Sequence, residues 1–133
     1  DASTRSDAMG ILESWVSHKE NPEETDYRAA REVLELMDSF AMTGLVLYSA
    51  GTPVAWTLAE TVADGRMSAV HFEKAKVEYR GAYQYVNYAF AQVLPESVEF
   101  VNREQDLGDE GMRQAKLTYR PVGFVEKYRV DRP

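Results

Sequence analysis

The sequence contains no cysteine among its 133 residues. This absence excludes disulfide bonds, thiolate zinc sites and cysteine nucleophiles. Only two histidines are present, His18 and His71, and neither belongs to a cluster with metal-ligand spacing, so we expect no metal site. His71 lies beside Glu73 in a strand-like segment, where a single histidine is more often structural than catalytic.

Long apolar runs are also missing. No stretch of about 18 or more apolar residues occurs, so we expect no integral membrane segment. The opening residues, DASTRSDAMG, lack the basic and apolar regions of a signal peptide, which favours a cytoplasmic protein. The sequence does not begin with methionine, and we therefore expect it to be a piece of a longer chain.

Positive charge is scarce except near the end. The net charge of −7 argues against nucleic-acid binding by the whole domain, because phosphate contacts need a cationic face. Between Met112 and Pro133, however, six basic residues stand against two acidic ones. Such a basic segment favours contact with a lipid headgroup, and hence a peripheral attachment to the membrane.

The apolar content of 44% and the chain length suit one core, so we predict a single domain over residues 1–133. Apolar spacing predicts helices over 7–19, capped by Ser6, and over 27–41, capped by Thr25 or Asp26. A hairpin follows, with its turn at Ser49-Ala50-Gly51-Thr52, and Asp64-Gly65 marks a second turn. The remaining predicted elements are a strand over 67–73, a helix over 82–94, a strand over 98–102, a helix over 109–119 and a strand over 123–130.

This order, two helices, three strands and then alternating helices and strands, predicts an α+β fold. Its mixed sheet should carry helices on both faces and crossover connections in the second half. In the strand over 67–73, strict alternation places Val70 and Phe72 on one face and His71 and Glu73 on the other.

Carboxylates at predicted strand ends are the main catalytic candidates. Glu73 closes one strand, and Glu104 and Asp106 follow another, so all three are candidates for a general base in a cleft flanked by Arg103 and Lys74. Alternatively, Glu104 and Arg103 are solvated loop charges, and Asp106 or Asp109 caps the next helix.

Two further features could bind phosphate. The turn at Arg80 and Gly81 leads directly into a helix, whose first backbone N–H groups either bind an anion or form a plain connection. Arg113, Lys116 and Arg120 share one helical face, which either grips phosphate or is simply the solvated side.

The segments HFEKAKVEYRGAYQYVNYAFAQVL and VEFVNREQDLGDEGMRQAKLTYRP closely resemble the C-terminal domain family of phosphatidylglycerol lysyltransferases, which includes soluble relatives of unassigned function. The resemblance covers roughly residues 44–130, and the helical residues 1–43 precede it. It implies a GNAT-like fold, the acyl-CoA N-acyltransferase architecture, with this chain as the second of two tandem domains. The N-terminal tandem domain is then an expected partner.

In that fold the strands ending near Glu73 and Asn102 splay apart, and donor and acceptor meet between them. The turn at 79–82 takes the place where classical members bind the pyrophosphate of coenzyme A. Tyr83, a bulky residue after Gly81 and Ala82, departs from the classical loop, and the lipid-modifying relatives use aminoacyl-tRNA. The resemblance therefore leaves both acyl-CoA and aminoacyl-tRNA as donors.

The resemblance implies transfer of an acyl or aminoacyl group to an amine or hydroxyl, such as that of a lipid headgroup. Catalytic candidates are Glu73, Glu104 and Asp106; substrate- or phosphate-binding candidates are Arg80, Gly81, Tyr83, Gln84, Asn102, Arg103, Arg113, Lys116 and Arg120. The alternative is a non-catalytic half that stabilises its tandem partner or binds a ligand without chemistry.

Overall fold

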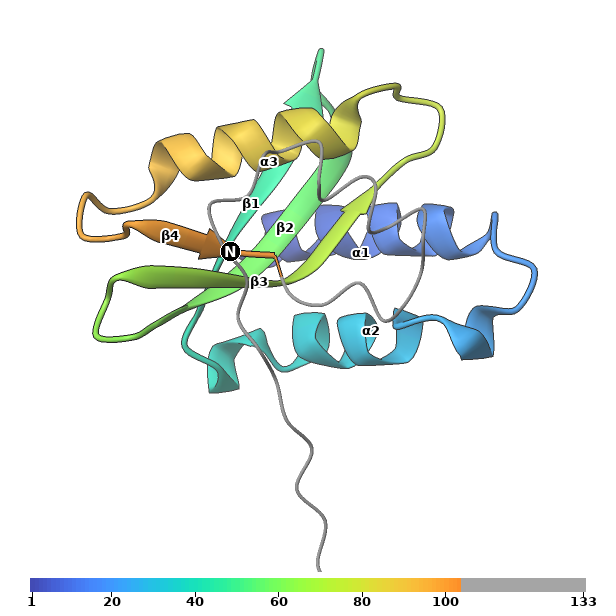
Figure 1. Ribbon diagram of the computed structural model, residues 1–133. Helices are drawn as coiled ribbons and strands as arrows, with labels where there is room; N and C mark the ends of the chain where they lie inside the picture. Colours follow the sequence, from blue (N-terminus) through green and yellow to red (C-terminus); the bar gives the residue numbers. More distant parts are fainter. Residues whose placement is uncertain (104–133) are drawn as a thin grey trace, which may run out of the picture.

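The computed structural model describes residues 1–103 (Figure 1). The predicted order of elements is confirmed for this part of the chain, whereas the predicted helix over 109–119 and strand over 123–130 lie outside it. The elements are α1 (Ala2–Val16), the 3-10 helix η1 (Pro22–Glu24), α2 (Tyr27–Glu35), the 3-10 helix η2 (Met37–Ser39), β1 (Met42–Ser49), β2 (Thr52–Val62), β3 (Met67–Ala75), α3 (Ala82–Val93) and β4 (Phe100–Asn102).

The sheet is mixed, in the order β1-β2-β3-β4. β1, β2 and β3 are antiparallel, and β4 returns through α3 to pair parallel with β3. Helices α1 and α2 cover one face and α3 covers the other (Figure 1). The predicted α+β architecture, with helices on both faces of a mixed sheet, is therefore confirmed.

The start of α1 differs from the prediction, and the start of α2 agrees with one of the two predicted caps. α1 begins at Ala2, and its cap is Asp1, whose carboxylate accepts from the backbone N–H of Thr4 at 2.9 Å; Ser6 lies inside the helix. At the start of α2 the Asp26 side chain makes no capping bond, and Thr25 Oγ1 accepts from the backbone N–H of Tyr27 at 3.2 Å instead. The predicted cap of α1 is wrong because several polar residues near its start have the right chemistry for a cap. At α2, Thr25 is one of the two predicted residues and makes the bond.

The second helix is shorter than predicted. α2 ends at Glu35, and the one-turn helix η2 follows before β1 begins at Met42. Met37 in this turn still packs against the core, so a 3-10 turn continues the apolar spacing without continuing the α-helix.

Both predicted hairpin turns are confirmed. Ala50 and Gly51 have φ angles of 49° and 81°, and Ala63, Asp64 and Gly65 have φ angles of 54°, 55° and 85°. Positive φ at consecutive positions produces the tight reversal that joins twisted antiparallel strands. These turns fix the register of the three-stranded meander on which the site is built.

β3 contains a β-bulge at His71. Leu58 pairs with Phe72 and Ala59 pairs with Val70, so the register of β3 against β2 shifts by one residue at His71. Val70 therefore packs with Phe90 of α3, while Phe72 packs in the cluster beneath α1 and α2. The predicted alternation, with Val70 and Phe72 on one face, is wrong because the extra residue changes the side to which later residues point.

Candidate functional site

The candidate site lies along the C-terminal half of β3. β4 pairs with β3 only at Met67, Ser68 and Ala69, and β3 continues to Ala75. Within residues 1–103, no strand pairs with β3 on this side beyond Ala69. We call the segment from Val70 to Ala75 the open edge of β3, because no strand among the described residues pairs with it on the side of β4.

Glu73 is the acidic group at the open edge. Its side chain is 10% exposed and accepts two hydrogen bonds, from Arg103 Nη2 to Oε1 at 2.9 Å and from Asn87 Nδ2 to Oε2 at 3.2 Å. Asn87 belongs to α3 and Arg103 follows β4, so the carboxylate joins three elements. The structure thus brings together two residues that the sequence singled out, Glu73 and Arg103.

The bulge decides where Glu73 points. Counting regular alternation from Val70 would place Glu73 on the side of α1 and α2. Because His71 is bulged out, Glu73 instead lies on the α3 side, next to Asn87. His71 in turn contacts Glu60 of β2, with Nε2 and Oε1 2.7 Å apart, rather than Glu73.

Lys74 points to the opposite face, which corrects the prediction that it flanks the same cleft as Arg103. Its Nζ donates to Asp26 Oδ1 at 2.7 Å and lies 4.0 Å from the ring centre of Trp15. The side chain is only 8% exposed, and this burial lowers the pKa of Lys74, although Asp26 acts in the other direction. Lys74 fastens the start of α2 and the end of α1 to β3.

Tyr83 stands in the first turn of α3, near the end of the open edge. Burial of its hydroxyl raises the pKa of Tyr83, a backbone hydrogen bond with Ala75 lowers it, and the charge of Glu73 raises it further. The residue as a whole remains 39% exposed. The hydroxyl of Tyr83 is therefore buried near the end of β3, within the influence of Glu73, while part of the residue remains accessible to solvent.

The turn before α3 has the geometry expected for an anion-binding loop. Gly81, the N-cap residue of α3, has a φ of 73°, a left-handed conformation that favours glycine, and it has no side chain to cap the first N–H groups of the helix. Arg80 and Gln84 are exposed on either side of it. These three predicted phosphate-binding residues thus share one end of α3.

Asn102 is the last residue of β4 and pairs with Ala69 where the two strands part. The other predicted site residues, Glu104, Asp106, Arg113, Lys116 and Arg120, lie outside the described residues. Asn87 is a residue that the sequence interpretation missed. The sequence signal that could have identified Asn87 was a polar amide next to the buried Val86 and Phe90, in a helical stripe that is otherwise apolar.

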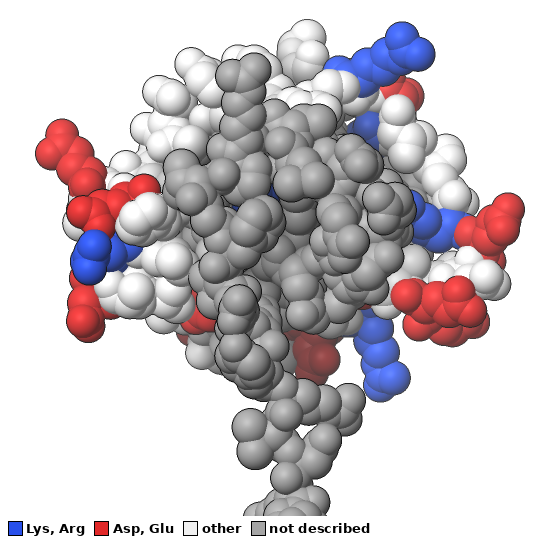
Figure 2. Space-filling view, viewed as in Figure 1, with Lys and Arg blue, Asp and Glu red and all other residues white. Residues whose placement is uncertain are grey.

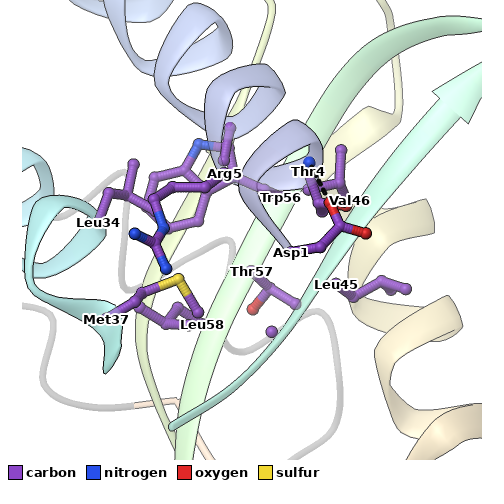
Figure 3. Close-up of a pocket in the computed structure, with 12 residues that line it drawn as sticks. Asp1, Thr4, Arg5, Leu34, Met37, Leu45, Val46, Trp56, Thr57 and Leu58 are labelled. Carbon is purple, nitrogen blue, oxygen red and sulfur yellow. Dashed lines mark hydrogen bonds between the residues drawn. The ribbon is translucent and has the colours of Figure 1, made fainter. Parts of the chain in front are cut away.

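A cavity of about 100 Å³ lies elsewhere, between α1, η2, β1 and β2 (Figure 3). Leu34, Met37, Trp56 and Leu58 line it, and Arg5 reaches over it from α1 (Figure 3). Typical ligand pockets hold roughly 300–1,000 Å³, so this cavity is too small for an acyl carrier. It is also on the β1 side of the sheet, away from Glu73.

Two kinds of site were not found within residues 1–103. No group of three or more His, Asp or Glu side chains is arranged to hold a metal ion. Nor does any helix in this part of the chain have the length and apolarity needed to cross a membrane.

A family profile matches almost the whole chain. The family is described as "Phosphatidylglycerol lysyltransferase, C-terminal", and the match covers residues 1–131. It therefore includes α1 and α2, which precede the region to which we limited the resemblance. No protein with a curated description matches the sequence.

Several solved structures share the fold. A conserved protein of unknown function from Bacteroides thetaiotaomicron VPI-5482 has 32% sequence identity and a TM-score of 0.74; the match covers 90% of this chain and 42% of that one. A ribosomal-protein-alanine N-acetyltransferase from Brucella melitensis biovar Abortus 2308 has 15% identity and a TM-score of 0.66, with 97% and 94% covered.

An aminoglycoside acetyltransferase from an uncultured soil metagenomic sample, solved in complex with sisomicin, has 11% identity and a TM-score of 0.65, with 100% and 90% covered. At such low identity, the two acetyltransferases show the shared fold alone. This chain spans less than half the length of the Bacteroides protein.

Proposed function

Because the chain belongs to the phosphatidylglycerol lysyltransferase C-terminal family and has the fold of GNAT acetyltransferases, we propose that it is an acyltransferase domain. The reaction is transfer of an acyl or aminoacyl group to an amine or hydroxyl. The observation that carries this proposal is the carboxylate of Glu73, held by two donors at the open edge of β3.

In the proposed reaction Glu73 is the general base. The acceptor nitrogen or oxygen attacks the donor's carbonyl carbon and loses a proton to Glu73, while the bond from that carbon to the leaving sulfur or oxygen breaks. The leaving group then takes a proton. The donor is acyl-CoA or aminoacyl-tRNA, and Arg80, Gly81, Tyr83 and Gln84 contact its phosphates from the start of α3.

The remaining proposed roles belong to residues that follow β4. Glu104 and Asp106 are further acidic candidates for proton transfer, and Asn102 and Arg103 contact substrate where β4 ends. Cationic Arg113, Lys116 and Arg120 would hold tRNA or lipid phosphate. A lipid headgroup as acceptor would place the protein at the cytoplasmic membrane surface, and binding to anionic vesicles that salt abolishes would support this location.

The proposal is tested by incubating the protein with acetyl-CoA or lysyl-tRNA and a primary amine, and detecting the product by mass spectrometry. Glu73→Gln should lower turnover by at least about 100-fold, a typical contribution of a general base. Glu104→Gln and Lys116→Ala should also lower it. Gln92→Ala, on the exposed side of α3, is the matched control. Unchanged turnover in Glu73→Gln would contradict the assignment.

A second candidate function, a non-catalytic half that stabilises a partner domain, is favoured by the outer side of α3. Tyr85 and Tyr88 are 59% and 62% exposed there, and residues 82–94 contain no charged residue. Uncharged tyrosine-rich faces are common in protein interfaces. The chain also spans only 42% of the Bacteroides relative, and the family name implies a preceding domain.

Calorimetric titration separates the two candidates. An acyltransferase domain should release or absorb heat when acetyl-CoA or charged tRNA is added, and Arg80→Ala should weaken that binding. A purely stabilising half should give no heat with either donor.

A further inference from the structure

We propose that Asn87 is a positioning residue for Glu73, and that Arg103 is its counterpart on the other oxygen of the same carboxylate. This inference rests on the proposed function and names residues that set the geometry of its base. Asn87 does not need to touch substrate; it acts through Glu73.

The geometry supports a fixed carboxylate plane. Asn87 Nδ2 lies 3.2 Å from Oε2, and Arg103 Nη2 lies 2.9 Å from Oε1. The two donors come from different elements, α3 and the end of β4, so neither bond allows the carboxylate to rotate without loss of the other. A base must lie within hydrogen-bond reach of the proton that it removes, so a fixed plane matters for the rate.

The carboxylate retains capacity after both bonds are made. Two carboxylate oxygens offer about four acceptor positions, and the two donors use one position on each oxygen. The remaining positions are available to an acceptor amine or to a water molecule at the open edge. Glu73 can therefore be held in place and still receive a proton.

The position of Asn87 is one where an apolar residue would otherwise suit the fold. Its neighbours Val86 and Phe90 are buried against β2 and β3, and Asn87 itself is half-buried. A half-buried amide is costly unless it is hydrogen-bonded, and the Asn87 amide donates to Glu73 Oε2. An asparagine at this position therefore favours a role in holding the Glu73 carboxylate over a role in packing alone.

The test compares two acceptors that differ in their need for a base. Ethanolamine is mainly an ammonium ion at neutral pH and must lose a proton, whereas hydroxylamine is mainly uncharged. With acetyl-CoA or lysyl-tRNA as donor, Asn87→Ala should lower kcat for ethanolamine by about tenfold or more, with little change for hydroxylamine and in the KM of the donor. Asn87→Gln, which keeps the amide donor, should recover part of the rate.

Each outcome has a distinct meaning. Equal losses with both acceptors, together with a lower Tm, would show a merely structural role and overturn the inference. If Glu73→Gln abolishes turnover with ethanolamine but Asn87→Ala does not, the inference fails and the proposed function stands. If neither donor gives product, or Glu73→Gln is fully active, the proposed function fails and the inference fails with it. Gln92→Ala again serves as the control.

Discussion

Two adjacent residues of β3 carry opposite charges to opposite faces of the sheet. Glu73 points to the α3 side, where Asn87 and Arg103 hold it, and Lys74 points to the α1 and α2 side, where Asp26 and Trp15 hold it. Both side chains are about equally buried, at 10% and 8% exposed. The difference lies in their partners rather than in their burial.

The partners indicate different roles. Lys74 is enclosed by an aromatic ring and a carboxylate that belong to the helical layer, so its contacts fasten that layer to the sheet. Glu73 is held by an amide and a guanidinium at the place where β4 leaves β3, so it borders the open edge. We therefore assign Lys74 to stability and Glu73 to the proposed chemistry.

The largest expected effect comes from exchanging the two charges. Glu73→Lys combined with Lys74→Glu would place a cation beside Arg103 and a carboxylate beside Asp26, so both buried sites would hold like charges. We expect a loss of more than about 4 kcal/mol in the free energy of unfolding, measured by urea denaturation. The neutral pair Glu73→Gln with Lys74→Met is the control and should retain a cooperative transition.

A smaller effect is expected from Asp26→Ala, which leaves the ammonium of Lys74 buried without its carboxylate. Because Asp26 is 46% exposed, water can replace part of the lost contact, and we expect a cost of about 1–3 kcal/mol. In a Lys74→Met background the same substitution should cost much less. Equal costs in both backgrounds would show that Asp26 stabilises the fold independently of Lys74.

The effect of pH on the free energy of unfolding, through Lys74, should be smaller still. Burial lowers the pKa of Lys74 below 10.5 in the folded state, so between the two pKa values the unfolded chain binds more protons than the folded chain. The cost of burying the charge is present below the folded pKa and is relieved as the pH rises toward 10.5. The stability of the unaltered protein relative to Lys74→Met should therefore rise as the pH increases toward 10.5, and a fall over that range would contradict the shift.

The smallest effect is expected at the exposed pair of Arg66 and Glu99. Their contact is 2.7 Å, but the side chains are 64% and 53% exposed. Glu99→Gln should change the free energy of unfolding by no more than about 0.5 kcal/mol, because solvent screens the pair. A backbone bond from Glu99 N–H to the Arg66 carbonyl at 2.7 Å remains in the variant and holds the start of β4.

Much of this arrangement is readable from the sequence. The hairpin turns at Gly51 and Gly65, the helix after Gly81 and the family itself follow from local residue chemistry and from a specific string. The sequence also identified Glu73 and Arg103 as candidate site residues, and the structure places them in contact at 2.9 Å. Their proposed roles in catalysis and substrate binding stay predictions.

Other features depend on contacts between distant segments. The alternation from Val70 to Glu73 fits a regular strand as well as a bulged one, because the register against β2 decides at which residue the bulge occurs. Likewise, Asp26 looks like a helix cap until Lys74, 48 residues later, is seen to take its carboxylate. Asn87 could not be identified from the sequence, because its bond to Glu73 depends on how α3 packs beside β3.

The bulge at His71 has a consequence for aligning this chain with its relatives. The residues on both sides of it, Val70 and Phe72, already face consecutive residues of β2. A relative that lacks one residue here can therefore keep its acid and its lysine on the same faces, provided that its strand is regular. The gap in such an alignment belongs at His71, because a gap placed after Glu73 would match the acid of one protein with a residue on the wrong side of the other's sheet.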